Sequence, residues 1–210
     1  MSTYTRVKDH KINLFSSSFF LFEELVDSDN LDKMVDTIKN NSPDEAEKGE
    51  SVHGPTYKTN FHTRNLYGTI DLTECINILN EKLKNERSFV ELGEQPWYAE
   101  YGSTDCHDPH LHCNYQYNII SGKPYPEYDA RIWHYSMIIN LSNIGSTTFF
   151  NSNYSGLSSP FKSFSSKRGN VLLFPSNILH WVSPHRVDGQ IRRIISANLF
   201  LKFEEEWLCS

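Results

Sequence analysis

Two apolar segments near the C-terminus show the clearest strand patterns. Residues 170–174 (NVLLF) are followed by a loop and then by residues 191–201 (IRRIISANLFL). Alternation places one set of side chains on one face of the second segment: Arg192, Ile194, Ser196, Asn198 and Phe200. Both of its faces are largely apolar, so we expect a strand buried on both sides. A guanidinium near the start of such a strand requires an anion, because an unpaired buried charge is very costly.

Short aromatic and β-branched runs continue this pattern through the second half of the chain. Candidate strands span residues 96–101, 115–120, 131–141 and 147–151, and an earlier one spans residues 11–23. Polar residues dominate 40–60, which we predict to be loop, and 151–169, which we predict to be a long loop with room for one short strand. Many short strands without intervening helices are typical of an antiparallel sandwich or barrel.

Helical periodicity is confined to two segments. Within residues 27–41, apolar residues recur at helical spacing: Leu31, Met34, Val35 and Ile38. Within residues 71–85 the apolar stripe is Leu72, Cys75, Ile76, Leu79 and Leu83, and Asp71 is a candidate N-cap. The helices precede the strands, so we predict an α+β class, mainly β. We expect one domain over residues 1–210, with helices at about 28–87 packed outside a β core at about 96–201.

Composition narrows the classes of partner. The 210 residues carry a formal net charge of −6, which disfavours nucleic acid as a partner. The four cysteines are scattered without a CxxC pair, no signal-like segment opens the chain, and no apolar run approaches the roughly 20 residues of a membrane span. We therefore expect a cytoplasmic protein without a membrane partner.

A histidine cluster supplies the candidate chemistry. In residues 106–113 (CHDPHLHC), His110 and His112 form an HxH pair, whose side chains share a face if the segment is extended. That spacing lets both reach one metal ion, and His180 is the candidate third ligand. Three protein ligands leave the open positions that a catalytic metal needs. The ordinary alternative is that these histidines are exposed loop residues.

Other residues compete for these roles. His107 and Asp108 lie close enough to serve as ligands or to orient one, and His185 is an alternative distal histidine. Cys106 and Cys113 are spaced too widely for a zinc knuckle, and no second Cys/His pair follows at zinc-finger distance. We therefore do not predict a structural zinc site.

Taken together, these segments resemble the Fe(II)- and 2-oxoglutarate-dependent dioxygenase superfamily, nearest its prolyl-4-hydroxylase-like branch with phage and marine bacterial oxygenases. The resemblance lies in the W-x12-HxH spacing from Trp97 to His110, in YSMIINLSNIGSTTFF (135–150), in RGNVLLFPSNILHWVSP (168–184) and in RRIISAN (192–198). It covers about residues 12–201 and is strongest over 168–198. It implies a double-stranded β-helix, or jelly roll, with N-terminal helices packed on its major sheet.

The resemblance also implies a metal site. His110 matches the first histidine of the family's His-x-Asp pair and His180 matches the distal histidine, but His112 stands where the family has a carboxylate. Three imidazoles would bind Fe(II) with one less negative charge. Alternatively, a carboxylate such as Asp108 is the third ligand, or that ligand is missing, as in halogenating relatives.

A cosubstrate site is implied as well. Arg192 matches the residue that pairs with the far carboxylate of 2-oxoglutarate, and Arg193 is the alternative after a one-residue slip in register. Ser196 and Asn198 align with the family's strand ending, and Tyr101 is a candidate contact for the cosubstrate.

The function implied by the resemblance is that of a hydroxylase using Fe(II), 2-oxoglutarate and O₂. It would couple oxidative decarboxylation of 2-oxoglutarate to oxidation of a small-molecule or peptide substrate that the sequence does not specify. One alternative is a cupin-like metal protein that does not use 2-oxoglutarate, in which Arg192 is structural. Another is a catalytically inactive jelly-roll binding module with incidental histidines.

Overall fold

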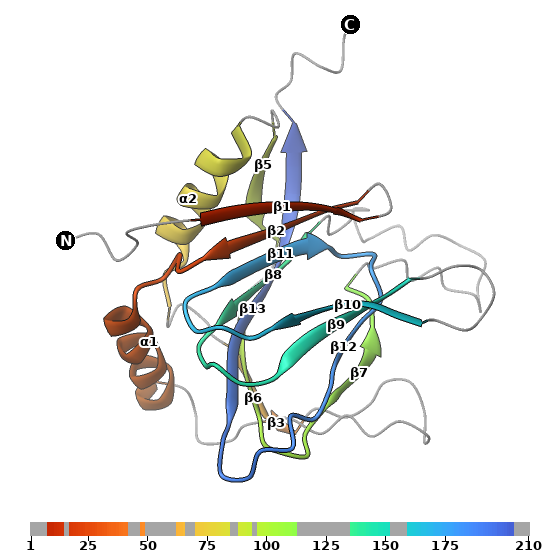
Figure 1. Cartoon of the computed structure of the whole chain (residues 1–210). Helices are drawn as coiled ribbons and strands as arrows, with labels where there is room; N and C mark the ends of the chain where they lie inside the picture. The colour runs from red at the N-terminus through yellow and green to blue at the C-terminus, as the bar shows by residue number, and fades with distance from the viewer. Residues whose placement is uncertain are drawn as a thin grey trace, which may run out of the picture.

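The strands form two antiparallel sheets that face each other, as the computed structural model shows (Figure 1). Alternating side chains of the larger sheet therefore point toward the smaller sheet or away from it. The structure describes residues 8–14, 17–41, 47–48, 62–65, 70–84, 88–93, 96–112, 135–151 and 159–203.

The larger sheet has the strand order β1-β2-β11-β8-β13-β6-β4-β3, and β5 also pairs with β13. Its strands are β1 (Lys8–Leu14), β2 (Ser17–Glu23), β3 (Glu47–Lys48), β4 (His62–Asn65), β5 (Ser88–Leu92), β6 (Trp97–Tyr101), β8 (Tyr135–Asn140), β11 (Val171–Pro175) and β13 (Arg192–Phe203). The long strand β13 lies between β8 and β6. Its two faces are apolar because residues of β13 belong to buried clusters on both sides of the sheet.

The smaller sheet has the order β10-β9-β12-β7. Its strands are β7 (His107–His110), β9 (Ser146–Asn151), β10 (Ser159–Ser165) and β12 (His180–Val182). The chain crosses repeatedly between the two sheets, and the predicted jelly-roll architecture is confirmed.

Two helices, α1 (Ser28–Asn41) and α2 (Thr73–Leu83), flank the larger sheet on the side away from the smaller one (Figure 1). The carboxylate of Asp71 accepts a hydrogen bond of 2.8 Å from the backbone N–H of Thr73, but the N-cap position is Leu72, one residue later than the predicted Asp71. Both helices lie where the apolar stripes were found. The helical periodicity read from the sequence is thus confirmed. Within the described residues, neither helix is long and apolar enough to cross a membrane.

The strand alternation separates two buried layers. The helix layer, between the helices and the larger sheet, includes Leu31, Ile38, Cys75, Leu79, Met137, Ile139, Ile195, Ala197 and Leu199. The inner layer, between the sheets, includes Phe19, Ala99, Tyr101, Ile138, Phe149, Phe164, Leu172, Phe174, Val182 and Ile194. On β13, Ile195, Ala197 and Leu199 belong to the helix layer, whereas Ile194 belongs to the inner layer, as alternation requires.

Several predicted boundaries were wrong. The strand expected at 11–23 is two paired strands, β1 and β2, divided where serines interrupt the apolar run. The loop expected at 40–60 contains β3. The one strand allowed for within the loop at 151–169 is present, as the seven-residue β10. The strand expected at 115–120 and the first part of that at 131–141 lie outside the described residues.

Candidate metal and anion site

Three histidines meet at one end of the inner layer. His110 is the last residue of β7 and His180 is the first of β12, and the two are direct partners across the paired strands. His112 follows β7 by two residues, and its Nε2 lies 2.9 Å from Nε2 of His110. One ring nitrogen from each of the three residues lies within 4.8 Å of the others. The HxH pair and the distal histidine therefore form one cluster, as their spacing predicted.

The backbone selects the tautomers of two of these rings. Nδ1 of His110 lies 2.6 Å from the carbonyl oxygen of Asp108, and Nδ1 of His180 lies 3.1 Å from that of Ile178. A carbonyl oxygen only accepts hydrogen bonds, so Nδ1 carries the proton in both rings. The lone pair of each Nε2 is then free to bind a metal.

The third ring is held by side chains of the larger sheet. Nδ1 of His112 lies 2.8 Å from Oδ1 of Asn198 and 2.9 Å from Oγ of Ser136. The backbone N–H of His112 donates a hydrogen bond of 2.9 Å to the carbonyl of Ser176. Because these two side chains hold Nδ1, the Nε2 atom on the other side of the His112 ring points away from them.

The cluster is suited to a metal cation. Burial lowers the pKa of His112 to about 4, and burial together with the neighbouring imidazoles lowers the pKa of His110 and of His180 well below their usual value. All three rings are neutral at pH 7 and offer lone pairs. Three imidazole nitrogens suit Fe, Zn, Cu or Ni, whereas Mg²⁺ and Ca²⁺ prefer oxygen ligands.

Aromatic rings enclose the cluster. The ring of Phe174 lies 4.9 Å from that of His180 between centroids, and the ring of Phe149 lies 5.8 Å from it. Trp97 lies 5.8 Å from His112. These rings restrict the orientation of the imidazoles and exclude water from one side of the site.

A buried cation lies deeper in the same inner layer. The side chain of Arg192 is 1 % exposed, and it donates hydrogen bonds to Ser166 Oγ (2.9 Å), the Ser146 carbonyl (3.1 Å) and Thr147 Oγ1 (2.8 Å). All three acceptors are neutral, and they use three of the five N–H groups of a guanidinium. Among the described residues, no carboxylate forms an ion pair with Arg192.

The surroundings hold this guanidinium in place. It lies 5.5 Å from the ring centroid of Tyr101, its partner across β13 and β6. Burial lowers the pKa of Arg192 to about 10, so it remains charged at neutral pH. Gly145 has φ +83°, and a Cβ at this position would lie 2.6 Å from Cδ of Arg192, so a larger residue would displace the arginine.

The register of β9 shows how far the histidine cluster lies from the Arg192 guanidinium along the strand. Phe149 of β9 pairs with His180, whereas Thr147, two residues earlier on β9, receives the Arg192 hydrogen bond. Two residues of a strand span about 7 Å. A cationic group and a metal-binding cluster thus lie within reach of the two ends of a small dicarboxylate.

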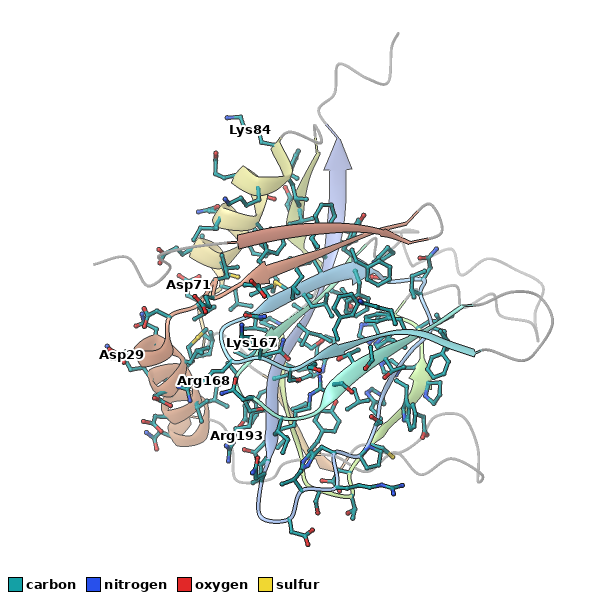
Figure 2. The ribbon with its side chains drawn as sticks, viewed as in Figure 1. Asp29, Asp71, Lys84, Lys167, Arg168 and Arg193 are labelled. Atoms are coloured by element: carbon teal, nitrogen blue, oxygen red, sulfur yellow. The ribbon has the colours of Figure 1, made fainter. Side chains whose placement is uncertain are left out.

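The neighbouring arginine has different surroundings. Nε of Arg193 donates a hydrogen bond of 3.0 Å to Glu100, and both side chains are partly exposed. Arg193 lies on the opposite face of β13, on the side of the molecule where α1 is found (Figure 2). Of the two arginines considered for cosubstrate binding, Arg192 is the one whose side chain points into the inner layer.

Sequence comparisons give no relatives: no protein-family model matches the chain, and no curated protein is detectably similar. Solved structures are similar in fold. SnoK, a non-haem α-ketoglutarate-dependent carbocyclase from nogalamycin biosynthesis, has a TM-score of 0.58 at 8% identity, covering 89% of this chain and 81% of SnoK. SnoN, an epimerase with the same cofactor requirement from that biosynthesis, has a TM-score of 0.57 at 10% identity, covering 91% and 82%.

A viral collagen prolyl hydroxylase from Paramecium bursaria chlorella virus 1, solved with 2-oxoglutarate, has a TM-score of 0.50 at 12% identity, covering 86% of this chain and 94% of the viral one. The fold is that of the Fe(II)- and 2-oxoglutarate-dependent oxygenases. The family resemblance read from the sequence is therefore confirmed at the level of the fold.

The other residues that competed for the ligand roles lie outside the group of three histidines. Asp108 contributes its backbone carbonyl to His110 and is not in the group of three residues that could hold a metal ion. His107 stacks on His110 with 3.7 Å between ring centroids. His185 lies 3.3 Å from the Tyr101 carbonyl and is also outside the group.

Two candidates for cosubstrate binding interact with the protein itself. The hydroxyl of Ser196 donates a 3.3 Å hydrogen bond to the carbonyl of Met137, and Asn198 contacts His112. Any contact of theirs with a cosubstrate stays a prediction. Cys106 is half-buried, forms no disulfide and is not one of the three residues that could hold a metal ion together, and Cys113 lies outside the described residues.

Sequence reasoning missed the polar residues that support the site. They come from strands and turns far apart in the chain: Ser136, Thr147, Ser166 and Ser176. Only the small polar residues within apolar runs, such as Ser136 in YSMIIN, signalled them. A buried strand rarely includes a hydroxyl without a partner, so that interruption could have been used.

Proposed function

We propose that this protein is an Fe(II)- and 2-oxoglutarate-dependent oxygenase. The observation that carries the proposal is the pair of groups in the inner layer: three converging imidazoles, and a buried guanidinium that only neutral atoms of the described residues contact. A metal alone would not require the guanidinium, and an anion alone would not require the imidazoles. A chelating dicarboxylate with a metal uses both.

The residues divide the work as follows. His110, His112 and His180 would hold the iron through Nε2, and Arg192 would bind the far carboxylate of 2-oxoglutarate with its remaining N–H groups. Once bound, the iron would supply the O₂ activation that couples decarboxylation of 2-oxoglutarate to oxidation of a substrate, most simply its hydroxylation.

The remaining inner-layer residues would act by positioning. Tyr101 covers one face of the guanidinium, and Gly145 leaves room for its methylene chain. Phe149 and Phe174 would keep water from the buried side of the imidazoles. These contacts prepare the site before ligands arrive, which lowers the cost of binding.

The substrate and the setting are also proposals. We propose a small-molecule or peptide substrate, because the net charge of −6 disfavours nucleic acid. We propose a cytoplasmic location, which agrees with the observation that neither Cys75 nor Cys106 forms a disulfide.

The test is to mix the protein with Fe(II) and 2-oxoglutarate without oxygen and record the visible charge-transfer absorption of the chelate. Admission of O₂ with ascorbate should then convert 2-oxoglutarate to succinate and CO₂, even if slowly without substrate. One atom of O₂ enters succinate, and ascorbate supplies the two electrons that reduce the other atom to water. No absorption band and no succinate would overturn the proposal.

A second candidate is favoured by His112, which stands where the oxygenase family has a carboxylate. Three neutral imidazoles also suit a cupin-like metal protein that does not use 2-oxoglutarate. In that case the metal would bind equally well in the presence and absence of 2-oxoglutarate, and the substitution Arg192→Met would not alter metal binding or any metal-dependent signal.

A further inference from the structure

The unusual ligand, His112, is held by residues from three separate parts of the chain. Asn198 of β13 and Ser136 of β8 are direct register partners, and both lie within 2.9 Å of Nδ1 of His112. The carbonyl of Ser176, just after β11, accepts a hydrogen bond from the backbone N–H of His112. The hydroxyl of Ser176 lies 3.0 Å from that of Ser136. The group is buried: Ser136 and Ser176 are each 0 % exposed and Asn198 is 6 % exposed.

The polarity of this group selects one tautomer. The hydroxyl of Ser136 donates a hydrogen bond of 2.8 Å to Oδ1 of Asn198, and this amide oxygen is also the atom that faces His112. An amide oxygen only accepts hydrogen bonds, so Nδ1 of His112 must carry the proton. The opposite tautomer would place the proton on Nε2 and prevent that atom from binding a metal.

We propose that Asn198 and Ser136 are positioning residues that commit His112 to act as the third metal ligand. The site is then built for three imidazoles: His112 takes the place of the carboxylate of the His-x-Asp pattern, and the buried polar group orients its ring. This assignment rests on the proposed function only in requiring a metal at the three histidines, and it is independent of 2-oxoglutarate.

The proposal also predicts the effect of the substitution His112→Asp. The substitution His112→Asp would restore the His-x-Asp pattern in the sequence, but it would remove the Nδ1–H that Asn198 and Ser136 accept and leave a buried polar group without this partner. We therefore expect His112→Asp to bind metal more weakly than the native protein.

The test uses Co(II) alone, followed by its visible d–d absorption under air-free conditions. Asn198→Leu should weaken Co(II) binding by roughly 10- to 100-fold, the usual effect of removing a residue that orients a ligand, and should change the absorption spectrum. Asn198→Asp retains an acceptor at the same place, so it should restore both the affinity and the native spectrum.

Asn140→Leu is the matched control. Asn140 is another buried amide of the larger sheet, four residues from Ser136 on β8, and its amide donates to the Asn170 carbonyl away from the histidines. The control should lose stability in a comparable way but keep the native Co(II) affinity and spectrum. Thermal unfolding of each apoprotein confirms that the binding assay measures folded protein.

The outcomes separate this assignment from the proposed function. Native affinity and spectrum in Asn198→Leu, or tighter binding by His112→Asp, would overturn the assignment alone. Loss of Co(II) binding in both Asn198→Leu and Asn198→Asp would also overturn it, because the acceptor would then not be what matters. A native protein that binds Co(II) as described but forms no complex with Fe(II) and 2-oxoglutarate would overturn the proposed function and leave the assignment standing.

Discussion

The two faces of the larger sheet bury different kinds of residue. The buried cluster of the helix layer is apolar apart from the thiol of Cys75 and the phenol of Tyr98. The buried polar residues of strands β8 and β13 point toward the inner layer instead: Ser136, Asn140, Arg192, Ser196 and Asn198. Buried polar groups are costly unless they are satisfied. Their concentration on one face indicates that the helix layer stabilises the fold, while the inner layer holds the site.

The adjacent arginines show the same contrast at the scale of one peptide bond. Arg193 faces the helix side and pairs with Glu100, as a partly exposed cation normally does. Arg192 faces the inner layer, and among the described residues it donates hydrogen bonds only to neutral acceptors. The chain supplies a carboxylate to one guanidinium and leaves the other available for an anionic ligand.

The largest expected effect is loss of the metal. His180→Ala removes one of three converging nitrogens from the buried end of the cluster, so Fe(II) binding by isothermal titration should become undetectable. His185→Ala is the matched control, because that ring lies five residues later and outside the group. Loss of binding in the control but not in His180→Ala would reverse the assignment of the distal ligand.

Damage to the helix layer should affect stability alone. Leu79 is completely buried in α2, and Leu79→Ala should lower the free energy of unfolding by about 2–5 kcal/mol through lost burial and a cavity. Urea denaturation measures this change. The metal affinity of the folded variant, measured without urea, should stay native. A large change in that affinity would contradict the separation of the two layers.

The arginine pair tests the comparison directly. Arg192→Met should weaken 2-oxoglutarate binding to the Fe(II) protein by roughly 100-fold, or about 3 kcal/mol, the scale of a buried charge-assisted pair. Arg193→Met removes a partly exposed ion pair worth at most about 1 kcal/mol of stability and should leave the affinity nearly unchanged. Equal effects on 2-oxoglutarate affinity would show that the face of β13 does not decide the role.

Local periodicity was sufficient to predict the parts of the fold that repeat regularly. The stripes of α1 and α2 and the alternation of β13 were confirmed because each depends on neighbours within one element. The short strands β7 and β12 have four and three residues. They pair with each other, and β12 also pairs with β9, and this pairing rather than their composition stabilises them. No pattern over so few residues predicts such a partner.

The site was predictable where it depends on residue chemistry and not where it depends on packing. The HxH pair, His180 and Arg192 stand out as costly residues beside apolar strands. The link from His112 to Asn198 joins residues 86 positions apart, and that to Ser136 spans 24. These contacts arise only after the sheets are aligned, so a serine and an asparagine within strands gave no indication of a shared role.

The smallest expected effect concerns the thiol of the helix layer. Burial, with a smaller contribution from Glu74, raises the pKa of Cys75 from 9.0 to about 12. The folded protein therefore keeps this thiol protonated at pH 10, where the unfolded chain ionises it. The stability that Cys75 contributes is complete below pH 9 and is lost as pH rises toward 12, by roughly 1 kcal/mol at pH 10.

Cys75→Ala removes this term, so its free energy of unfolding should fall less steeply than that of the native protein between pH 8 and about pH 10. Iodoacetamide should modify Cys75 in urea but not in the native protein at pH 9, as peptide mass spectrometry would show. Rapid native alkylation would mean that water reaches the helix layer. Cys75 is the most completely buried ionisable group of the helix layer. Its modification in the native protein would therefore contradict the contrast between an inert apolar helix layer and a reactive inner layer.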